Sequence, residues 1–509
     1  MGRRCVEVGD RRGHTDVRFP PADTFAPEPP TPELFVDARS PAGGSGTEAS
    51  PFQTIAEAVG TRTQGTLRLA AGEYPMSATV RLDGRWVIVG TGTDDLGTRL
   101  VPTAGAGFEV GSRATATPSE VTCAGLSMRY VPMATANAFT VSNRATLRLR
   151  DVAIVGAYRG IDTDESGVTL DGEHVTIRGS HTVGVTLGAD ARGIFRSLLV
   201  RETVDPRGQG IVTQGGHFWL SEVLITCNGL YGIGLLGNPR RGTGWESCAG
   251  DVPAMARGDL DCARDVSVQD EAATGVYLGG TYRVEARTIS VGGTRGFAGS
   301  GGDGIAVLRG GSVDLDPELT MSNGTTRGVG SELVGNRRAG VLADGASSVV
   351  ALHGTMVRDN VGPGIFVQNL ASAQVIERAQ VERNGGVGLG FTDGTRAEVI
   401  QGNGIVATRV LPTMTTVGMV ELADGLLLNG ATMGMITGNE INQNARFGLL
   451  VMPATTATVT ANRGTGNLYG IGNYSTMSAV SGNTLTGTRD SARPAMAPLV
   501  GANLTSPTM

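Results

Sequence analysis

The sequence predicts an all-β solenoid in which short parallel strands stack coil upon coil, and three observations lead to this fold class. Gly makes up 78 of the 509 residues, about twice the usual share, while charged residues reach only 18%. A Gly followed by an aliphatic residue recurs, and seven of eleven successive intervals are 22 to 26 residues long. After that Gly, apolar residues alternate over only four or five positions. A strand this short cannot bury its own apolar face, so each repeat must stack on its neighbours.

The N-terminal region precedes the repeats. Residues 1–32 end in the proline-dense segment FPPADTFAPEPPTPE, which predicts an extended tether. The following segment, LFVDARSPAGGSGTEASPFQTIAEAVG, predicts a short strand, a loop and a helix near residues 51–59. Ser50 is expected to cap this helix, with Pro51 in its first turn, and the helix to cover the end of the core. GTLRLAAGEYP and RWVIVGTGT predict the strands that follow.

The repeat region is defined by twelve marker glycines, at which glycine is expected to supply a permissive backbone for a bend. They are Gly160, Gly184, Gly210, Gly232, Gly275, Gly304, Gly340, Gly364, Gly388, Gly425, Gly448 and Gly470. The longer intervals predict insertions, the longest at about residues 237–272. We therefore assign residues 33–487 to the solenoid and residues 488–509 to a C-terminal tail.

A recurring asparagine stands four residues before five of the markers. These residues are Asn228, Asn336, Asn360, Asn384 and Asn444. Asparagine tolerates the left-handed conformation and can hydrogen-bond to its counterpart in the adjacent coil. The spacing therefore predicts a ladder of stacked asparagines.

These repeats, with LFVDARSPAGGSGTEASPFQTIAEAV and the strand GTLRLAAGEY, resemble secreted proteins of the pectin-lyase-like superfamily over roughly residues 33–487. The resemblance implies a single-stranded right-handed parallel β-helix, an extracellular or cell-surface location, and a groove along one outer sheet for a polysaccharide or cell-surface glycan. The superfamily includes lyases, hydrolases, epimerases and adhesins, so the resemblance selects no activity. Since the paired-aspartate, GHG and RIK motifs of polygalacturonases and the DPHD signature of alginate epimerases are missing, no catalytic residue is carried over.

Alignment of the strands by their inward-facing pairs predicts two polar columns on one outer face. One column contains Asp151, His174, Ser197 and Glu222, and the other contains Arg129, Arg178 and Arg201. Arginine offers planar donors to a uronate, and a carboxylate or imidazole can move a proton. The arginines are therefore candidate ligand-binding residues, and His174, Asp151 and Glu222 are candidate catalytic residues. The alternative is the ordinary polar face that any soluble sheet presents.

The acidic cluster at Asp162 and Asp164 supplies hard oxygen ligands of the kind that calcium prefers. Their counterparts in the next coil are Thr186 and Gly188, which complete no cage of carboxylates. We therefore predict a solvated turn and no metal or other cofactor, with calcium as the alternative.

The five cysteines show no CxxC or Cys/His spacing typical of zinc sites. Cys248 and Cys262 bracket the polar loop CAGDVPAMARGDLDC, which a disulfide would close. This predicted disulfide favours an oxidising compartment.

Composition excludes several function classes. All 42 basic residues are Arg, which excludes a lysine nucleophile or Schiff base, and the net charge of −6 without a basic run argues against nucleic acid and anionic membranes. No signal peptide or membrane span is visible.

An apolar stripe is predicted two residues after several markers. It contains Val212, Tyr277, Leu342, Phe366, Leu427 and Leu450. Such a stripe is expected to be covered by the insertions, and self-association or sugar stacking is the alternative.

Together these patterns favour an extracellular or cell-surface β-helix without catalytic activity that binds carbohydrate or serves as a structural or adhesive module. The alternative is a polysaccharide lyase, glycoside hydrolase or epimerase that acts on an acidic polysaccharide along the arginine face.

Overall fold

The computed structural model describes residues 29–103, 105–111, 118–130, 134–163, 167–240, 243–245, 248, 260–296, 301–316, 330–415 and 418–489, with only the backbone for 412–415 and 418–420. Most of the predicted tether and tail lies outside these residues. The chain divides into a first unit, residues 1–229 with 239–259, and a second unit, residues 230–238 with 260–509.

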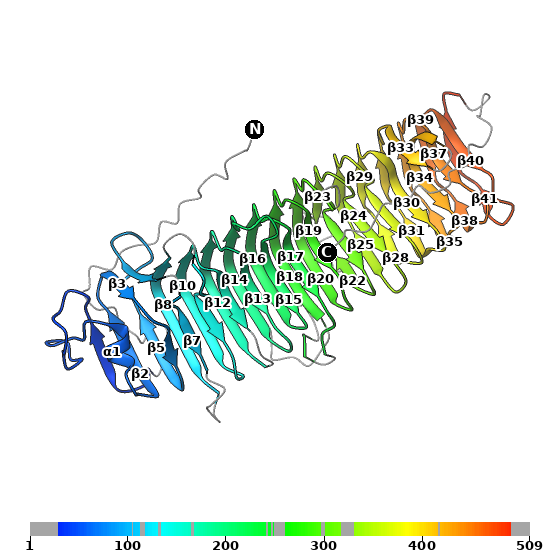
Figure 1. Ribbon diagram of the computed structural model, residues 1–509. Coiled ribbons are helices and arrows are strands. Elements are labelled where there is room, and N and C mark those ends of the chain that lie inside the picture. Colours follow the sequence, from blue (N-terminus) through cyan, green and yellow to red (C-terminus); the bar gives the residue numbers. More distant parts are fainter. Residues whose placement is uncertain are drawn as a thin grey trace, which may run out of the picture. The chain divides into compact units, whose positions relative to one another are not determined.

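The first unit contains two sheets of parallel strands (Figure 1). Sheet A1 consists of β1 (Glu33–Val36), β2 (Gln64–Leu69), β3 (Gly72–Met76), β5 (Arg85–Val89), β6 (Thr98–Pro102), β8 (Glu120–Arg129), β10 (Thr146–Val155), β12 (Thr169–Arg178), β14 (Arg192–Arg201) and β16 (His217–Thr226). Sheet B1 consists of β4 (Val80–Leu82), β7 (Phe108–Val110), β9 (Phe139–Val141), β11 (Arg159–Thr163), β13 (Val183–Leu187) and β15 (Gln209–Gln214).

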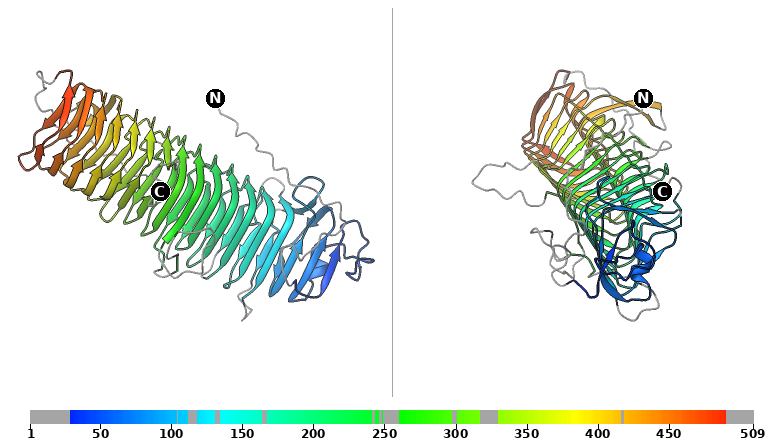
Figure 2. Two further views of the ribbon diagram at one scale, coloured as in Figure 1. Left: turned by 180° about the vertical axis from the view of Figure 1, so that it is seen from behind. Right: turned by 90° about the vertical axis from the view of Figure 1, so that its left-hand side faces the viewer.

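The second unit repeats this arrangement, and beyond β20 its A-sheet strands are short, which Figure 2 shows from behind and from the side. Sheet A2 consists of β18 (Leu260–Gln269), β20 (Arg283–Gly292), β22 (Ser312–Leu315), β23 (Glu332–Val334), β25 (Val349–His353), β26 (Met356–Arg358), β28 (Ser372–Glu377), β29 (Gln380–Glu382), β31 (Arg396–Gln401), β32 (Gly404–Val406), β35 (Thr432–Thr437), β36 (Glu440–Asn442), β38 (Thr456–Thr460), β39 (Arg463–Asn467), β41 (Ala479–Ser481) and β42 (Thr484–Gly487). Sheet B2 consists of β17 (Tyr231–Leu236), β19 (Thr274–Leu278), β21 (Ile305–Leu308), β24 (Val341–Asp344), β27 (Ile365–Gln368), β30 (Gly386–Thr392), β34 (Gly418–Asn429), β37 (Phe447–Val451) and β40 (Tyr469–Asn473).

The pairing between coils confirms the predicted fold class. Within each unit, the described strands of successive coils pair in parallel, as β10 does with β12 and β34 with β37. The antiparallel partner of β34 is β33 (Leu411–Thr415), which belongs to an insertion between Gly388 and Gly425. The chain is therefore an all-β parallel solenoid, and the period of 22 to 26 residues corresponds to one coil.

The inward positions after the marker glycines are buried as predicted, for example Val185 and Leu187 in the first unit and Ile365 and Val367 in the second. Side chains of successive coils therefore fill the space enclosed by the sheets, which is the core of each unit.

The long strands of sheet A1 bend near their middle. The bend residues of β10, β12, β14 and β16 are Asp151, His174, Ser197 and Glu222, and all four have φ between 49° and 55°. The register between β10 and β12 passes over Asp151 and His174, while the residues on both sides remain paired. A non-glycine residue thus adopts the left-handed conformation at the same place in β10, β12, β14 and β16, which divides each of these long strands into two short ones.

The marker glycines correct one prediction, because none of the twelve has a positive φ. Nine of them lie within strands, whereas Gly304, Gly340 and Gly364 stand at a bend directly before a strand. A Cβ at Gly184 would lie 2.4 Å from Val200 Cγ1 and 2.6 Å from Gly210 O of the next coil. Glycine is therefore needed there for close approach and not for a left-handed backbone.

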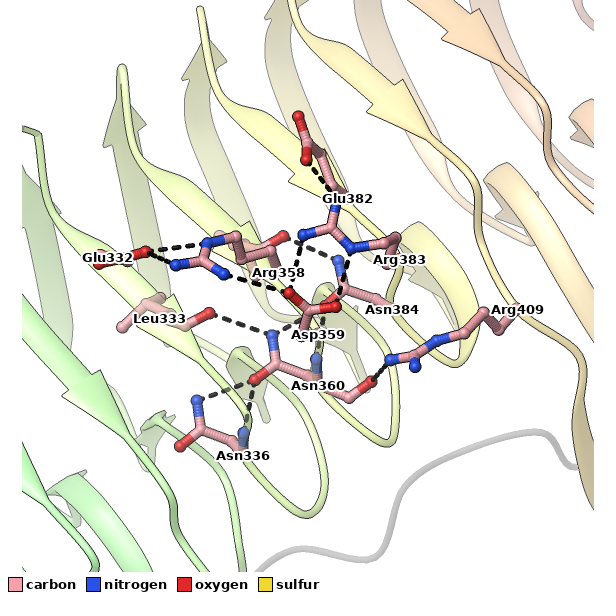
Figure 3. Close-up of polar contacts among 11 residues, drawn as sticks. Glu332, Leu333, Asn336, Arg358, Asp359, Asn360, Glu382, Arg383, Asn384 and Arg409 are labelled. Atoms are coloured by element: carbon pink, nitrogen blue, oxygen red, sulfur yellow. Dashed lines mark hydrogen bonds and ion pairs between the residues drawn. The ribbon is translucent and has the colours of Figure 1, made fainter.

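The asparagine ladder is confirmed in the second unit (Figure 3). Asn336 Nδ2 donates to Asn360 Oδ1 (2.9 Å), and Asn360 Nδ2 donates to Asn384 Oδ1 (2.8 Å). The left-handed residue, however, is the one before the asparagine: φ of Asp359 is 56°, whereas Asn360 has no positive φ. The expectation that the asparagines themselves adopt this conformation was wrong.

A second asparagine ladder in the same unit was not predicted. Asn403, Asn439, Asn462 and Asn483 are joined in this order by side-chain hydrogen bonds of 2.9, 2.8 and 2.9 Å. Their backbone N–H groups take part as well, since Asn403 N and Asn439 N each donate to the Oδ1 atom of the next rung.

The helix α1 is shorter than predicted and spans Ile55–Val59. Its N-cap is Thr54 and not Ser50, because Thr54 Oγ1 accepts from Glu57 N and the Glu57 carboxylate accepts from Thr54 N. Ile55 and Val59 are buried. That this helix covers the end of the core stays a prediction.

The apolar stripe is buried at all six predicted positions. In the second unit Leu427 and Leu450 pack in one cluster with Leu422 of the β33–β34 hairpin, as expected for coverage by an insertion. Tyr277 stacks on Tyr231 with 4.5 Å between ring centroids.

Candidate functional site

The arginine column on the outer face of sheet A1 has the predicted register. Arg129 is aligned with Val155, Val155 with Arg178, and Arg178 with Arg201. Arg178 Nε donates to Glu202 Oε2 (2.9 Å), and Arg201 is buried with 7% of its surface exposed. Arg178 therefore contacts a carboxylate of its own chain, and Arg201 offers little surface to a ligand.

Arg129 likewise has a carboxylate partner in its own chain, because its Nη1 lies 2.7 Å from Asp95 Oδ1. The bend column also contains paired groups. His174 Nδ1 lies 3.3 Å from Asp151 Oδ1, and Ser197 Oγ donates to Glu222 Oε2 (2.8 Å). These contacts are what a polar ladder on the surface of a sheet produces, and they also place an imidazole beside a carboxylate.

The opposite sheet of the first unit, B1, carries a groove that sequence reasoning missed. Its volume is about 420 Å³. It is lined by Thr79, Gly107, Phe108, Glu109, Thr135, Ala136, Asn137, Thr140, Tyr158 and Arg159. The lining combines an aromatic ring, charged groups, a hydroxyl and an amide, which is the mixture that ligand sites use to orient a polar molecule.

A column of aligned side chains runs along sheet B1, and two of its members, Glu109 and Thr140, line the groove. Arg81 of β4 is aligned with Glu109 of β7, Glu109 with Thr140 of β9, Thr140 with Asp162 of β11, and Asp162 with Thr186 of β13. Adjacent rungs are about 4.8 Å apart because they belong to neighbouring strands. The column thus presents polar groups at regular intervals along the solenoid.

The charges of the column are paired within it. Arg81 Nε donates to Glu109 Oε2 (2.9 Å), and Arg159 Nη1 donates to Asp162 Oδ1 (2.8 Å). The other carboxylate oxygen of Asp162 accepts from Asn137 Nδ2 (3.1 Å). Both oxygens of the buried Asp162 carboxylate are therefore hydrogen-bonded, whereas the Arg81 side chain is largely exposed.

Two further features point into the same region. Thr186 is buried, and its Oγ1 has no hydrogen-bond partner among the residues that the structure describes. Tyr158, on the groove wall, stacks on His181 with 5.7 Å between ring centroids and 26° between ring planes. The groove thus has an aromatic wall that packs against His181, and the Thr186 hydroxyl belongs to the neighbouring part of the same column.

A second hollow of about 370 Å³ adjoins the groove. It lies beside α1, and its lining includes Ile55, Tyr74 and Met76. Thr79 lines both spaces, and Arg81 lines the hollow while its guanidinium contacts Glu109 in the groove. The two spaces are therefore neighbours in the first unit.

Part of the long insertion is attached to sheet A1. Thr243 O accepts from Arg192 Nε (2.7 Å), and Trp245 packs edge-on against Trp219. Cys227, Cys248 and Cys262 are each disulfide-bonded, and Cys123 is a free, buried thiol whose pKa burial raises to about 12. The pairing of Cys248 with Cys262 stays a prediction.

A charged cluster in the second unit lies beside the asparagine ladder (Figure 3). Arg358 contacts Glu332 (2.5 Å) and Asp359 (3.2 Å), and Arg383 contacts Asp359 (2.8 Å) and Glu382 (2.9 Å). The hydrogen bond from Arg383 holds the pKa of Asp359 below its usual range. Each charge has an opposite partner, so the cluster is a stabilising network that joins coils.

The predicted metal ligands do not form a cluster. No group of three or more His, Cys, Asp or Glu side chains is placed to hold a metal ion within the described ranges. Asp162 is bonded to Arg159 and Asn137, and Asp164 lies outside the described residues. Calcium binding stays a prediction.

A signal for the groove was present in the sequence. The position two residues after the marker is apolar in several coils, beginning with Val212. Followed toward the N-terminus, the same position becomes Thr186 and Asp162, and the paired strands continue it to Thr140 and Glu109. Glu109 and Thr140 precede the first marker glycine, so the repeat pattern alone did not reach them.

No protein-family model and no curated protein matches the chain. Among solved structures, the catalytic domain of a GH87 α-1,3-glucanase in complex with nigerose matches at 13% identity and a TM-score of 0.31, over 83% of this chain and 65% of that one. The mannuronan C-5 epimerase AlgE4 A-module of Azotobacter vinelandii matches at 15% identity and a TM-score of 0.35, over 88% of this chain and 100% of that one.

Tailspike protein 3 of bacteriophage CBA120 matches at 11% identity and a TM-score of 0.34, over 85% of this chain and 61% of that one. The match thus spans less than two thirds of the glucanase and tailspike structures. With TM-scores below 0.5, these likenesses assign neither a family nor an activity to the chain. In the parts of the chain that the structure describes, no helix has the length and apolar character needed to cross a bilayer.

Proposed function

We propose that the chain binds carbohydrate through the groove on the outer face of sheet B1. The observation that carries this proposal is that one groove is lined by the stacked Tyr158, by Glu109 and Thr140 of the polar column, and by Arg159, which pairs with Asp162. Sugar rings have an apolar face that packs on aromatic rings and an equatorial belt of hydroxyls that both donate and accept hydrogen bonds. Regular rungs about 4.8 Å apart suit a polymer that runs along the solenoid.

The groove supports binding more directly than turnover. Asp162 already accepts hydrogen bonds on both oxygens, and Glu109 is bonded to Arg81, so neither carboxylate is set apart as a proton donor or base. We therefore propose a carbohydrate-binding or adhesive module, with the extracellular or cell-surface location as part of the same proposal.

A second candidate function is an enzyme that acts on an acidic polysaccharide along the outer face of sheet A1. The contact between His174 Nδ1 and Asp151 favours it, because a carboxylate orients an imidazole for proton transfer. On this proposal Arg178 exchanges Glu202 for a uronate, at about 1.5 to 3 kcal/mol for the charged hydrogen bond, and His174→Ala abolishes turnover while leaving affinity largely unchanged.

A glycan array followed by calorimetry with the best oligosaccharide tests the proposal. Tyr158→Ala is expected to weaken binding by about tenfold, or about 1.4 kcal/mol, because the aromatic wall is lost. Arg178→Gln is the matched control on the other sheet of the same unit and is expected to leave the affinity unchanged.

The same two variants separate the two candidate faces. Loss of affinity in Arg178→Gln with none in Tyr158→Ala would transfer the site to sheet A1. A wild-type chain that binds no oligosaccharide on the array would refute carbohydrate binding altogether.

A further inference from the structure

We infer that the groove on sheet B1 selects uncharged polysaccharides over uronate polymers, an inference that rests on the proposed function and names its ligand class. The carbohydrate expected from the arginine column on sheet A1 is acidic. In the groove, the guanidinium groups of Arg159 and of the adjoining Arg81 are each paired with a carboxylate, so neither offers an uncompensated positive charge to a uronate.

The four charged groups of the groove and its column form two ion pairs with one another. Arg159 Nη1 lies 2.8 Å from Asp162 Oδ1, and Arg81 Nε lies 2.9 Å from Glu109 Oε2. A guanidinium that already faces a carboxylate at this distance gains little from a second one, which must also approach the first carboxylate against like-charge repulsion. A uronate would therefore bind at a cost that an uncharged sugar avoids.

The polar atoms that remain suit hydroxyl groups. The Glu109 carboxylate has lone pairs beyond the one used by Arg81, and Thr140 contributes a hydroxyl that both donates and accepts. A sugar hydroxyl can donate to one of these groups and accept from another, whereas a carboxylate can only accept.

Burial makes the Asp162 pair the more selective of the two. The Asp162 side chain is 12% exposed, and Asn137 holds its second oxygen, so this carboxylate cannot turn away to release Arg159. Glu109 and Arg81 are 31% and 70% exposed, so solvent and salt screen that pair more strongly. Replacing Asp162 by its neutral isostere should therefore convert the groove into a site that accepts a uronate.

The experiment compares one oligosaccharide with the same oligosaccharide oxidised at C6 to its uronate, by calorimetry at low salt. For the wild-type chain we expect the neutral form to bind at least tenfold more tightly. In Asp162→Asn the uncompensated Arg159 is expected to raise uronate affinity at least fivefold, and the gain should vanish at 0.5 M NaCl because it is ionic.

Asp171→Asn is the matched control. Asp171 on sheet A1 also pairs with an arginine, Arg150, at 2.7 Å, but it lies on the other sheet of the same unit. A similar gain of uronate affinity in this variant would reveal a nonspecific effect of charge and overturn the inference. If Asp162→Asn does not fold, Glu109→Gln frees the exposed Arg81 and is expected to give a smaller gain of the same sign.

The outcomes separate the inference from the proposed function. If the wild-type chain binds the uronate as tightly as the neutral form or more tightly, the inferred selectivity is wrong, but carbohydrate binding stands. The same conclusion follows if the preference for the neutral form is unchanged in both Asp162→Asn and Glu109→Gln. Absence of binding to either form refutes the proposed function and the inference with it.

Discussion

The residue directly after the first bend of each coil differs between the two units. In the first unit this position is aliphatic, at Val152, Val175 and Leu198, and these residues are buried in the core. In the later coils of the second unit it is asparagine, and Asn403, Asn439 and Asn462 are bonded to one another.

The backbone at the bend is the same in both cases. The residue before Val175 has φ of 54°, and the residue before Asn462 has φ of 55°. The left-handed residue therefore defines the bend, and the next position can be stabilised either by apolar burial or by a stack of amides. The asparagine ladder is therefore one of two ways in which the coils stabilise the residue that follows the same bend.

The largest expected change in the free energy of unfolding comes from breaking a buried ion pair of the second unit, compared with a more exposed ion pair of the first unit. Asp303 of the second unit is fully buried and accepts from Arg338 Nε (2.8 Å) and Ala339 N (3.1 Å), and burial raises its pKa while Arg338 opposes this. Asp303→Ala should lower the free energy of unfolding by about 3 to 5 kcal/mol, because it leaves the largely buried charge of Arg338 without its partner. Urea titration followed by circular dichroism measures the change.

The matched variant in the first unit is Asp171→Ala, which removes a partner of Arg150 from a more exposed network. Its cost is expected to be about 1 kcal/mol or less, because solvent screens the remaining charge. Equal losses in the two variants would mean that burial does not distinguish the ion pairs of the two units.

The next effect tests whether the two kinds of bend support are interchangeable. Asn439→Val places an aliphatic residue, as the first unit has at this position, in the asparagine ladder of the second unit. We expect a loss of about 3 kcal/mol, because in a buried environment Asn403 N and Ile400 O lose their bonds to Asn439, and Asn403 Nδ2 keeps only its bond to Ile376 O. Retention of wild-type stability in urea titration would show that the ladder is dispensable.

Replacing a marker glycine is expected to cause a smaller loss of stability, of the same size in both units. Ala at Gly184 or at Gly388 would place a Cβ 2.6 Å from the carbonyl oxygen of the neighbouring coil, at a cost of about 2 kcal/mol. The control is Gly402→Ala, where φ is 62° and a Cβ meets no atom within 4 Å, so only the left-handed backbone costs about 1 kcal/mol. Melting temperatures of the three variants check the order, and a larger shift in Gly402→Ala would contradict it.

The smallest effect is pH dependence in the second unit. His353 lies 3.5 Å from Asp314 through Nε2 and 3.1 Å from Glu377 through Nδ1, and these carboxylates raise its pKa, Asp314 most strongly. Arg378 and Gln401 also contact Glu377 and compete for it.

Because the folded pKa of His353 is above the unfolded value of about 6.5, its contribution is complete below pH 6.5 and is lost as the pH rises through the folded pKa. His353→Gln should therefore lower stability by about 1 kcal/mol at pH 5.5, and less at pH 8.5. A difference that does not change between these two pH values would contradict the assignment.

Local sequence determined the coil, because alternation over four residues and a period near 24 are properties of consecutive positions. It therefore predicted the strands, the inward residues such as Val185 and Leu187, and the parallel stacking. The arginine column also followed from aligning strands by their inward pairs. These features depend only on the order of residues within one coil and its repeat in the next.

Only the tertiary structure decided which atoms meet between coils. Gly184 is needed because Gly210 O of the next coil leaves no room for a Cβ. The repeat pattern does not predict this close approach. The groove combines Glu109 and Thr140 from two coils with Tyr158 from a connecting segment. Its neutral character arises because Arg159 turns toward Asp162 three residues away. Sequence separation specifies neither the side-chain direction nor the depth of burial on which this pairing depends.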